Sequence, residues 1–435
     1  MSKVVIAANP LHGHVSPLLS IARDLVARGH EVVVYTGARF EERALATGAR
    51  FRALPPDVDF DDRNIGAYFP ALAAVPPGPA REAFGIHQFF VAPVPSQLRG
   101  LRALLDEFPA HVVMSEQSFV TAVALALATP AGQRPVLVTL GIAGPVFLSE
   151  DTPPFGMGIP PMEGEEGRAR NRAMNAEARK VFAEAQKCSE ETFASIGLTL
   201  SEFVLNALVS APDHYLQLTV PSFEYPRSDA PAHFRCIGPI PQDPSGDYDP
   251  PAWWSELSGD RPVIVVTQGT LANGDLTELV VPTVRGLADL DVLVVAAPVR
   301  EDGPDDVRRE LGEVPANTRL AAFVPFDRLL PRADVLVTNG GYGGVHTALH
   351  HGVPLVVAGA TEDKPDVAAQ VEWSSTGVNL RTGTPHAADV RAAVQTVLAD
   401  PNFRLRAETL NKEFNQYRPF DAIAEIVEAA TRPTR

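Results

Sequence analysis

The sequence predicts an α/β protein in which two Rossmann-like domains, each built on a parallel sheet, face each other across a central cleft. The chain has 435 residues, which is too long for one typical hydrophobic core. In both halves short apolar strands alternate with helical stretches, a pattern typical of βαβ units and doubly wound sheets. A stretch rich in Pro and Asp, residues 239–251, separates the two alternating series.

The expected elements of the first half follow from its apolar runs and its helix-ending residues. Pro17 is expected to open the first helix, and Gly29 follows the end of that helix. The expected strands of this half cover residues 4–8, 31–36, 50–54, 111–115 and 135–140. The expected helices cover residues 17–28, 40–47 and most of 163–210.

The second half repeats the alternation and ends in an amphipathic stretch. Its expected strands cover residues 263–267, 292–296, 318–321, 335–338 and 355–357. Residues 420–431 have the pattern of a helix that packs back across the first domain. The predicted division is an N-terminal domain at 1–238, a linker at 239–261, a C-terminal domain at 262–415 and a terminal segment at 416–435.

The bulk composition argues against several classes of protein. Lys plus Arg is 37 and Asp plus Glu is 53, so the formal net charge is −16. A surface this acidic repels nucleic acid and anionic membranes, so a phosphate ligand needs a local site. No apolar run is long enough to predict a membrane span, and the N-terminal apolar run predicts a strand, not a signal peptide. With Cys188 and Cys236 alone, no disulfide framework is expected, and we predict a cytoplasmic protein.

The most informative motif is a glycine cluster between the strand at 335–338 and a helical stretch. Glycines let backbone N–H groups approach a ligand without interference from Cβ, and the N-terminus of the following helix attracts anions. We therefore expect a phosphate or pyrophosphate site at Gly340, Gly341, Gly343 and Gly344. A turn that needs glycine only for tight packing is the alternative.

Two further polar turns point to the same edge of the second sheet. Thr270 follows the strand at 263–267, and Asp363 and Lys364 follow the strand at 355–357. Ligands of doubly wound sheets bind beyond the carboxyl ends of the strands, where these turns converge. This convergence favours a nucleotide-phosphate site over packing alone.

Two histidines, His12 and His14, occupy the turn before the first helix. The Gly-x-Gly-x-x-Gly fingerprint of dinucleotide binding is absent at this position. A helix N-terminus disfavours protonated imidazole, so either histidine is a candidate neutral base near pH 7. Histidines that merely cap or line the turn are the alternative.

Taken in order, the motifs resemble those of glycosyltransferase family one, the nucleotide-sugar-dependent transferases of the GT-B fold. The chain is most similar to the bacterial enzymes of this family that act on polyketides, macrolides and other lipophilic natural products. The resemblance spans essentially the whole chain. It rests on residues 13–17, 234–239, 323–325, 338–349, 352–354 and 363–364.

The resemblance implies a catalytic pair in the first domain. His14 matches the general base that deprotonates an acceptor hydroxyl, and His12 is the second candidate. Glu116 matches the acid, more often Asp, that orients this base, although a solvated loop acid is the alternative. Direct displacement inverts the anomeric configuration, while N–H groups at 341–344 stabilise the departing diphosphate. No metal is then required, and Asp-x-Asp triplets such as 57–59 are expected by chance in so acidic a chain.

Several donor-site positions depart from the residues that are common in the family. Asn339 stands where His is common, Gly344 where Ser is, Thr347 where Glu is and Lys364 where Gln is. Thr347 is too short to replace Glu in a ribose contact. We therefore expect these four changes to affect which donor binds more than which reaction is catalysed. The implied donor-binding residues are Thr270, Phe323, Val324, Asn339, Gly340, Gly341, Gly343, Gly344, Asp363 and Lys364.

Apolar loops in the first half predict a hydrophobic acceptor pocket for a flat or macrocyclic molecule. Each aromatic residue in them is equally compatible with a role as a loop anchor. The candidate acceptor-binding residues are His12, Phe69, Phe84, Phe89, Phe90, Phe147 and Phe155.

The prediction is an inverting, metal-independent transferase that moves a hexose from a UDP- or dTDP-sugar to a hydroxyl of a lipophilic natural product. It needs no cofactor besides this nucleotide sugar as co-substrate. A sugar-nucleotide epimerase is a second hypothesis, since two Rossmann-like domains also host such enzymes. A non-catalytic nucleotide-binding partner of a transferase is a third, motivated by Asn339, Gly344 and Thr347.

Overall fold

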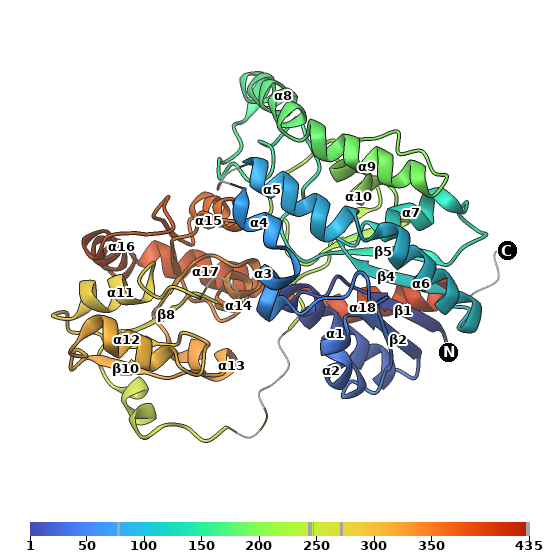
Figure 1. Cartoon of the computed structure of the whole chain (residues 1–435). Coiled ribbons are helices and arrows are strands. Elements are labelled where there is room, and N and C mark those ends of the chain that lie inside the picture. The colour runs from blue at the N-terminus through green and yellow to red at the C-terminus, as the bar shows by residue number, and fades with distance from the viewer. Residues whose placement is uncertain (76–78, 242–245, 247, 270–272, 432–435) are drawn as a thin grey trace.

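The computed structural model describes residues 1–75, 79–241, 246, 248–269 and 273–431, and it contains two parallel sheets (Figure 1). The first sheet has seven strands in the order β3-β2-β1-β4-β5-β6-β7. The second has six strands in the order β10-β9-β8-β11-β12-β13. Figure 1 shows the first sheet with its helices on one side of the molecule and the second sheet with its helices on the other, which confirms the predicted GT-B type of α/β fold.

The strands follow the apolar runs closely. The first sheet contains β1 Lys3–Ala7, β2 Glu31–Thr36, β3 Arg50–Ala53, β4 Val112–Glu116, β5 Val136–Gly141, β6 His214–Gln217 and β7 Phe234–Cys236. The second contains β8 Val263–Thr267, β9 Leu293–Ala296, β10 Thr318–Leu320, β11 Val335–Thr338, β12 Leu355–Val357 and β13 Gly377–Asn379. The sequence prediction missed β6, β7 and β13, which are short and carry polar residues that break an apolar run.

The helices lie between the strands. The first half contains α1 His12–Ala27, η1 Ala38–Phe40, α2 Glu41–Leu45, η2 Asp62–Asn64, α3 Ile65–Tyr68, α4 Pro70–Ala74, α5 Pro79–Ile86, η3 His87–Val91, α6 Val94–Glu107, α7 Thr121–Ala128, α8 Gly164–Val181, α9 Ala183–Ser195 and α10 Val204–Ser210. The second half contains η4 Ala252–Ser258, α11 Val280–Leu287, α12 Gly303–Leu311, α13 Phe326–Leu329, η5 Leu330–Arg332, α14 Tyr342–His350, α15 Lys364–Trp373, α16 Ala387–Ala399, α17 Pro401–Phe414 and α18 Pro419–Ala429.

The start of α1 corrects the prediction that Pro17 opens this helix. The helix begins at His12, with Leu11 as its N-cap residue, and Pro17 lies inside it. Pro17 is the sixth residue of this helix and lacks the N–H that would donate to the Gly13 carbonyl, so the helix loses this one hydrogen bond. His12 and His14 therefore lie in the first turn of α1 and not in the loop before it.

The strand order identifies one ligand crevice in each half. In the first sheet β1 lies between β2 and β4, and in the second β8 lies between β9 and β11. The connections on the two sides of β1, and likewise of β8, run in opposite directions across the sheet. This reversal of strand order leaves a crevice at the carboxyl ends of the strands. The turns after β1 and β4 therefore lie together, as do the turns after β8 and β11.

One segment of the first half packs against the second. After β6, Val220 and Phe223 join the hydrophobic core around β8 and α14, and the chain then returns to form β7. Two polar contacts accompany this excursion. Gln217 Nε2 donates to the Tyr342 hydroxyl at 2.9 Å, and the Thr219 hydroxyl lies 2.7 Å from His346 Nε2.

The terminal helix α18 packs on the first sheet and its helices (Figure 1). Its Ile423, Ile426 and Val427 lie in the same hydrophobic core cluster as Val4 of β1. The Ser2 hydroxyl donates to the carbonyl of Val427 at 2.9 Å. The C-terminal end of the chain thus stabilises the N-terminal domain.

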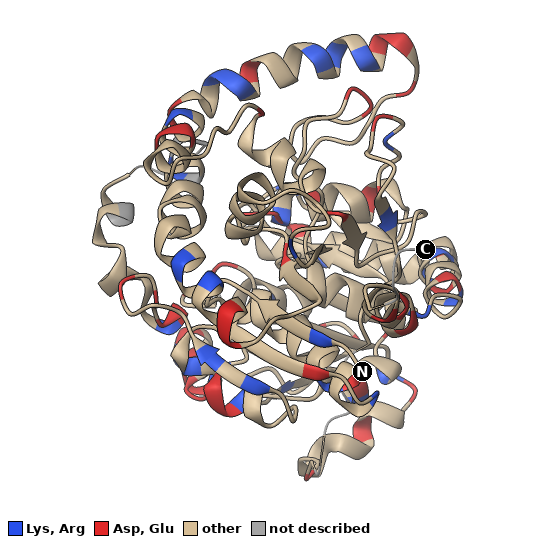
Figure 2. Cartoon of the chain, turned by 90° about the vertical axis from the view of Figure 1, so that its right-hand side faces the viewer, with Lys and Arg blue, Asp and Glu red and all other residues tan. Residues whose placement is uncertain are grey.

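Charge and hydropathy add two observations. On the side drawn in Figure 2, Lys and Arg residues are interspersed with Asp and Glu and do not gather on one face. Across the part of the chain that the structure describes, none of the helices combines the length and the apolar character needed to cross a bilayer.

The packing of α18 predicts a stability difference between its two faces. Ile423→Ala removes buried side-chain volume and is expected to cost about 2–5 kcal/mol of unfolding free energy. Glu425→Ala, on the exposed face of the same helix, is expected to stay within about 0.5 kcal/mol. Differential scanning calorimetry checks both variants, and equal melting temperatures would show that α18 does not support the N-terminal domain.

Candidate functional site

A histidine and a buried carboxylate meet in the crevice of the first sheet. His14 lies in the first turn of α1, and Glu116 is the last residue of β4. Their Nδ1 and Oε1 atoms are 3.2 Å apart, which is an ion-pair distance, although the angle departs from that of a hydrogen bond. The His14 side chain is 21% exposed and the Glu116 side chain 0%, so a ligand in the crevice reaches the imidazole and not the carboxylate.

Backbone and side-chain donors hold the Glu116 carboxylate in place. Asn9 Nδ2 donates to Oε1 at 2.8 Å, and the Ser118 N–H donates to Oε2 at 2.5 Å. Glu116 is therefore not a solvated loop acid, the alternative that the sequence left open. Asn9 was not among the candidate residues, and its position directly after the expected strand at 4–8 was the signal that could have identified it.

The pair changes the basicity of His14. Burial lowers the pKa of His14, but the charge of Glu116 and the contact with it, helped by Asp363 and Asp62, outweigh burial and raise the pKa above its usual value. Burial raises the pKa of Glu116, but His14 and the donors from Ser118 and Asn9 outweigh it and lower that pKa. The net effect on His14 thus favours its protonated form, contrary to the expectation of a neutral imidazole, because the adjacent carboxylate outweighs burial.

His12 has different surroundings. Its backbone N–H donates to Asp62 Oδ2 at 2.6 Å, and its Nδ1 lies 3.3 Å from Arg43 Nη1. Burial, together with the positive charges of Arg43 and Arg39, lowers the pKa of His12. The structure therefore brings His14, and not His12, to a carboxylate that can orient the imidazole.

Aromatic side chains form a wall next to His14. We define the aromatic cluster as Phe60, Tyr68, Phe69, Phe89 and Phe90. Phe90 stacks on the His14 ring with centroids 5.8 Å apart and planes at 20°. Phe89 and Phe90 lie on η3, a π-helical turn, and such turns occur frequently at functional sites. Phe60 was not a candidate residue, yet its ring centroid lies 5.1 Å from that of Phe69 and 6.1 Å from that of Phe89.

Three other candidate aromatic residues lie elsewhere. Phe147 is 7% exposed and packs against Phe234 with ring centroids 5.9 Å apart, so it is a core residue outside the aromatic cluster. Phe84 is half-buried on α5. Phe155 is half-buried in the loop between β5 and α8. An aromatic residue in an apolar, loop-like stretch has the same sequence pattern whether it lines a pocket or anchors a loop. The sequence therefore could not separate these three residues from the members of the aromatic cluster.

The glycine cluster forms the turn between β11 and α14. Gly340 has φ +87°, and a Cβ there would lie 2.6 Å from Val357 Cγ1, so this position requires glycine for packing. Gly341 is the N-cap residue of α14. Side chains added at Gly343 or Gly344 would meet nothing within 4 Å. The first turn of α14 is thus open to a ligand, and its N–H groups have no intrahelical acceptor.

The turn after β8 is tied to the glycine turn. Asn339 Nδ2 donates to the carbonyl of Gln268, the residue that follows β8. The Gln268 side chain in turn accepts from the N–H of Val280 at 3.1 Å at the start of α11. Asn339 therefore links two turns of the crevice. Thr270 lies outside the described residues.

Asp363 and Lys364 occupy the N-terminus of α15. Lys364 is almost fully buried, and its Nζ contacts Glu362 and, at 3.4 Å, the Thr361 hydroxyl. Burial raises the pKa of Asp363 to about 6, although the charge of Lys364 opposes this change. The charge of Asp363 also contributes to the raised pKa of His14, so the two crevices are electrostatically connected.

The remaining donor candidates divide into exposed and core positions. Phe323 is 62% exposed at the edge of the second domain, whereas Val324 belongs to the hydrophobic core. The Thr347 hydroxyl donates to the Gly343 carbonyl at 2.8 Å, one turn back along α14.

Within the described ranges, no group of three or more His, Cys, Asp or Glu side chains is arranged to hold a metal ion.

Comparisons with known proteins agree with this architecture. Residues 283–429 match a family model described as the C-terminal domain of proteins like erythromycin biosynthesis protein CIII. The chain is 39% identical to UDP-glycosyltransferase 2 of Phaeomoniella chlamydospora, over 98% of this chain and 95% of that protein. It is 40% identical to 4'-demethylrebeccamycin synthase of Lentzea aerocolonigenes, over 98% of both. The solved structure of the kitacinnamycin glycosyltransferase superimposes with a TM-score of 0.74 at 25% identity, covering 99% of each chain.

The ion pair predicts how His14 titrates. In the native protein the pKa of His14 is expected above its usual value of about 6.5. The pair therefore stabilises the fold fully below that pH, and this contribution is lost as the pH rises through the folded-state pKa. In Glu116→Gln only burial and weaker charges remain, so the pKa of His14 is expected to fall. Histidine NMR titrations of both proteins measure the change, and an unchanged pKa would contradict the assigned pairing.

The glycine turn predicts opposite effects at two neighbouring positions. Gly340→Ala places a Cβ at positive φ and against Val357, and should cost about 1–3 kcal/mol of unfolding free energy. Gly343→Ala lies in an exposed turn of α14 and should be neutral or stabilising by up to about 1 kcal/mol. Urea unfolding of the two variants measures both effects. Similar losses at both positions would show that the turn is not constrained by packing at Gly340.

Proposed function

The chain belongs to glycosyltransferase family one, and from this premise we propose that it is an inverting, metal-independent enzyme that transfers a hexose to a hydroxyl of a lipophilic natural product. The proposed donor is a nucleoside diphosphate sugar, either a UDP-hexose or a dTDP-hexose. The observation that carries the proposal is the His14–Glu116 pair, which lies in one crevice and is electrostatically connected to Asp363 in the other. The names of the relatives, a UDP-glycosyltransferase and 4'-demethylrebeccamycin synthase, support the donor and acceptor classes.

The proposed reaction begins with proton transfer to His14. Its Nδ1 faces Glu116, so Nε2 is the nitrogen that takes the proton from the acceptor hydroxyl. The hydroxyl oxygen forms a bond to the anomeric carbon of the sugar while the bond from that carbon to the diphosphate oxygen breaks. The electron pair leaves with the diphosphate. Attack opposite the leaving group inverts the anomeric configuration, and the Glu116 carboxylate stabilises the imidazolium that forms.

The second domain supports departure of the diphosphate. Negative charge develops on the leaving oxygen, and the open first turn of α14 offers N–H groups and the positive end of its dipole. With a formal net charge of −16, the chain as a whole does not attract a diphosphate. Local donors at the glycine turn are therefore the source of affinity in this proposal.

The first domain supports a lipophilic acceptor. The aromatic cluster continues from the His14 ring through Phe90 and Phe89 to Phe69. A hydroxyl near His14 would belong to a molecule whose apolar body rests on this wall. A catalytic pair of this kind has no role in a purely nucleotide-binding partner protein, and an epimerase needs no apolar wall.

The test is transfer to an acceptor, followed by substitution of the base. UDP- and dTDP-hexoses are incubated with hydroxylated aromatic and macrocyclic acceptors, and mass spectrometry detects a hexose adduct. His14→Ala is expected to lower the transfer rate about 10²- to 10⁴-fold while UDP binding stays within about twofold. His12→Ala should lose far less.

Three results would overturn parts of the proposal. Full activity of His14→Ala would exclude it as the base. A product with the donor's anomeric configuration, detected by NMR coupling constants, would exclude inversion. A loss of activity in EDTA that added Mg²⁺ restores would exclude metal independence.

A further inference from the structure

A loop of the first domain contacts α15 of the second domain, the helix whose N-terminus carries the donor candidates Asp363 and Lys364. We call residues 152–163, between β5 and α8, the bridging loop. The backbone N–H groups of Gly156 and Gly158 donate to the two carboxylate oxygens of Asp366 at 2.5 and 2.7 Å. Gly158 has φ +60°, and a Cβ there would lie 3.0 Å from Pro365. The loop backbone thus lies directly on the first turn of α15.

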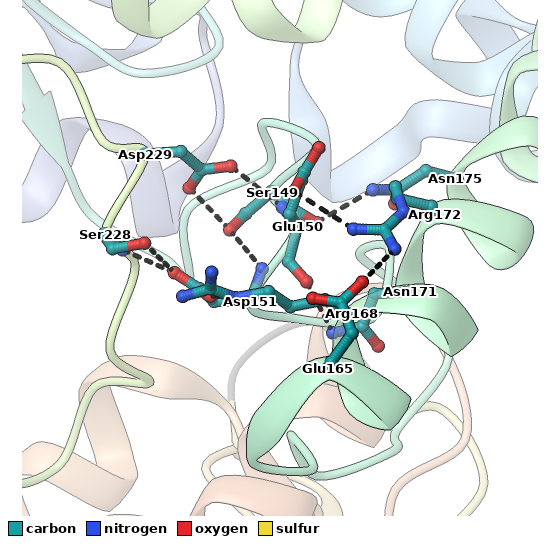
Figure 3. Close-up of polar contacts among 10 residues, drawn as sticks. All are labelled: Ser149, Glu150, Asp151, Glu165, Arg168, Asn171, Arg172, Asn175, Ser228 and Asp229. Atoms are coloured by element: carbon teal, nitrogen blue, oxygen red, sulfur yellow. Dashed lines mark hydrogen bonds and ion pairs between the residues drawn. The ribbon is translucent and has the colours of Figure 1, made fainter.

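Both ends of the bridging loop are held within the first domain. Figure 3 shows the residues before the loop, Ser149, Glu150 and Asp151, bonded to α8 and to the segment at 228–229. The Asp151 carboxylate accepts from both the N–H and the hydroxyl of Ser228 at 2.6 Å, and Arg168 pairs with it at 2.9 Å (Figure 3).

The far end of the loop is held in a similar way. Arg170 Nη2 donates to the Pro160 carbonyl at 3.1 Å. A Cβ at Gly167 would lie 1.8 Å from the Met162 carbonyl oxygen, so the loop and α8 are in backbone contact there. The loop is braced at both ends, and its middle is attached to the other domain through Asp366.

Asp366 belongs to a stripe of α15 that faces the first domain. Gln370, one turn on, donates from Nε2 to Glu224 at 3.1 Å, and Trp373 packs edge-on against Tyr225 at 5.2 Å. Positions i, i+4 and i+7 lie on one face of a helix. The N-terminus of the same helix carries Asp363 and Lys364, two of the donor-binding residues that the family resemblance implies.

We propose that Asp366 is a positioning residue that fixes the bridging loop, which carries the acceptor candidate Phe155, against the N-terminus of α15, which carries the donor candidates Asp363 and Lys364. The proposal rests on the transfer reaction proposed above. Asp366 touches no reacting atom in this scheme, so it acts on acceptor affinity and leaves the chemical step unchanged. Two hydrogen bonds to a partly buried carboxylate hold the loop, and each hydrogen bond to a charged group contributes more than a neutral one.

The expected result is a change confined to the acceptor. Asp366→Asn removes the charge and one of the two acceptor oxygens, and should raise the acceptor KM about tenfold or more. The donor KM and kcat at saturating acceptor should stay within about threefold. Gly158→Ala disturbs the same contact from the loop side. It should also raise the acceptor KM and leave the donor KM and kcat within about threefold. Glu372→Gln is the matched control, since Glu372 lies on the same helix but pairs with Arg381 within the second domain.

Hydrogen exchange tests the contact without turnover. Amide exchange in peptides covering Gly156 and Gly158 should accelerate at least about tenfold in Asp366→Asn and stay unchanged in Glu372→Gln. Unchanged exchange and unchanged acceptor KM in Asp366→Asn would overturn the proposal. Equal changes in acceptor KM, donor KM and kcat would also overturn it, because they indicate general damage. If no acceptor is turned over, the transfer reaction fails, and hydrogen exchange alone decides whether Asp366 holds the loop.

Discussion

The buried charge of Glu116 is the constraint on which the rest of the site depends. A carboxylate without solvent contact is costly unless it is paired and hydrogen-bonded. His14 supplies the pairing, and Asn9 and Ser118 supply the donors. Asn9 is itself held, because its side-chain oxygen accepts from Gln97 Nε2 at 3.1 Å. The hydrogen bonds of the His14–Glu116 pair therefore extend into the core of the first domain, and the packing of β1 against β4 sets the position of the imidazole.

The same logic links the two domains. Each sheet places its crevice at the carboxyl ends of its strands, but a transfer reaction also requires that the crevices face each other. Polar contacts join the two halves at their boundary: Gln217 with Tyr342, Thr219 with His346, and Glu224 with Gln370. His346 is enclosed at this boundary, and burial lowers its pKa to about 4, so it stays neutral near pH 7. These contacts join the end of β6 and the segment after it to α14 and α15, the helices whose N-termini carry the proposed donor-binding residues.

Charge acts locally in this protein. The formal net charge is strongly negative, yet the proposed diphosphate site lies at a helix N-terminus where N–H groups are open. The pKa of Asp363 is raised by burial, and its charge in turn favours protonated His14 across the cleft. In the proposed reaction, a donor bound next to Asp363 would therefore change the electrostatic surroundings of His14.

The sequence by itself determined the two α/β halves, because apolar runs and glycine turns are local signals of strands and strand-to-helix turns. It also placed His14, Glu116 and the glycine cluster at strand ends, since the family resemblance is carried by short contiguous motifs. Only the tertiary structure decided which side chains meet. Phe60 joins the aromatic cluster while Phe147 lies in the core, Asn9 holds Glu116, and Asp366 reaches the bridging loop. These contacts join residues far apart in the chain, and no local pattern encodes them because they depend on how the two sheets and their loops pack together.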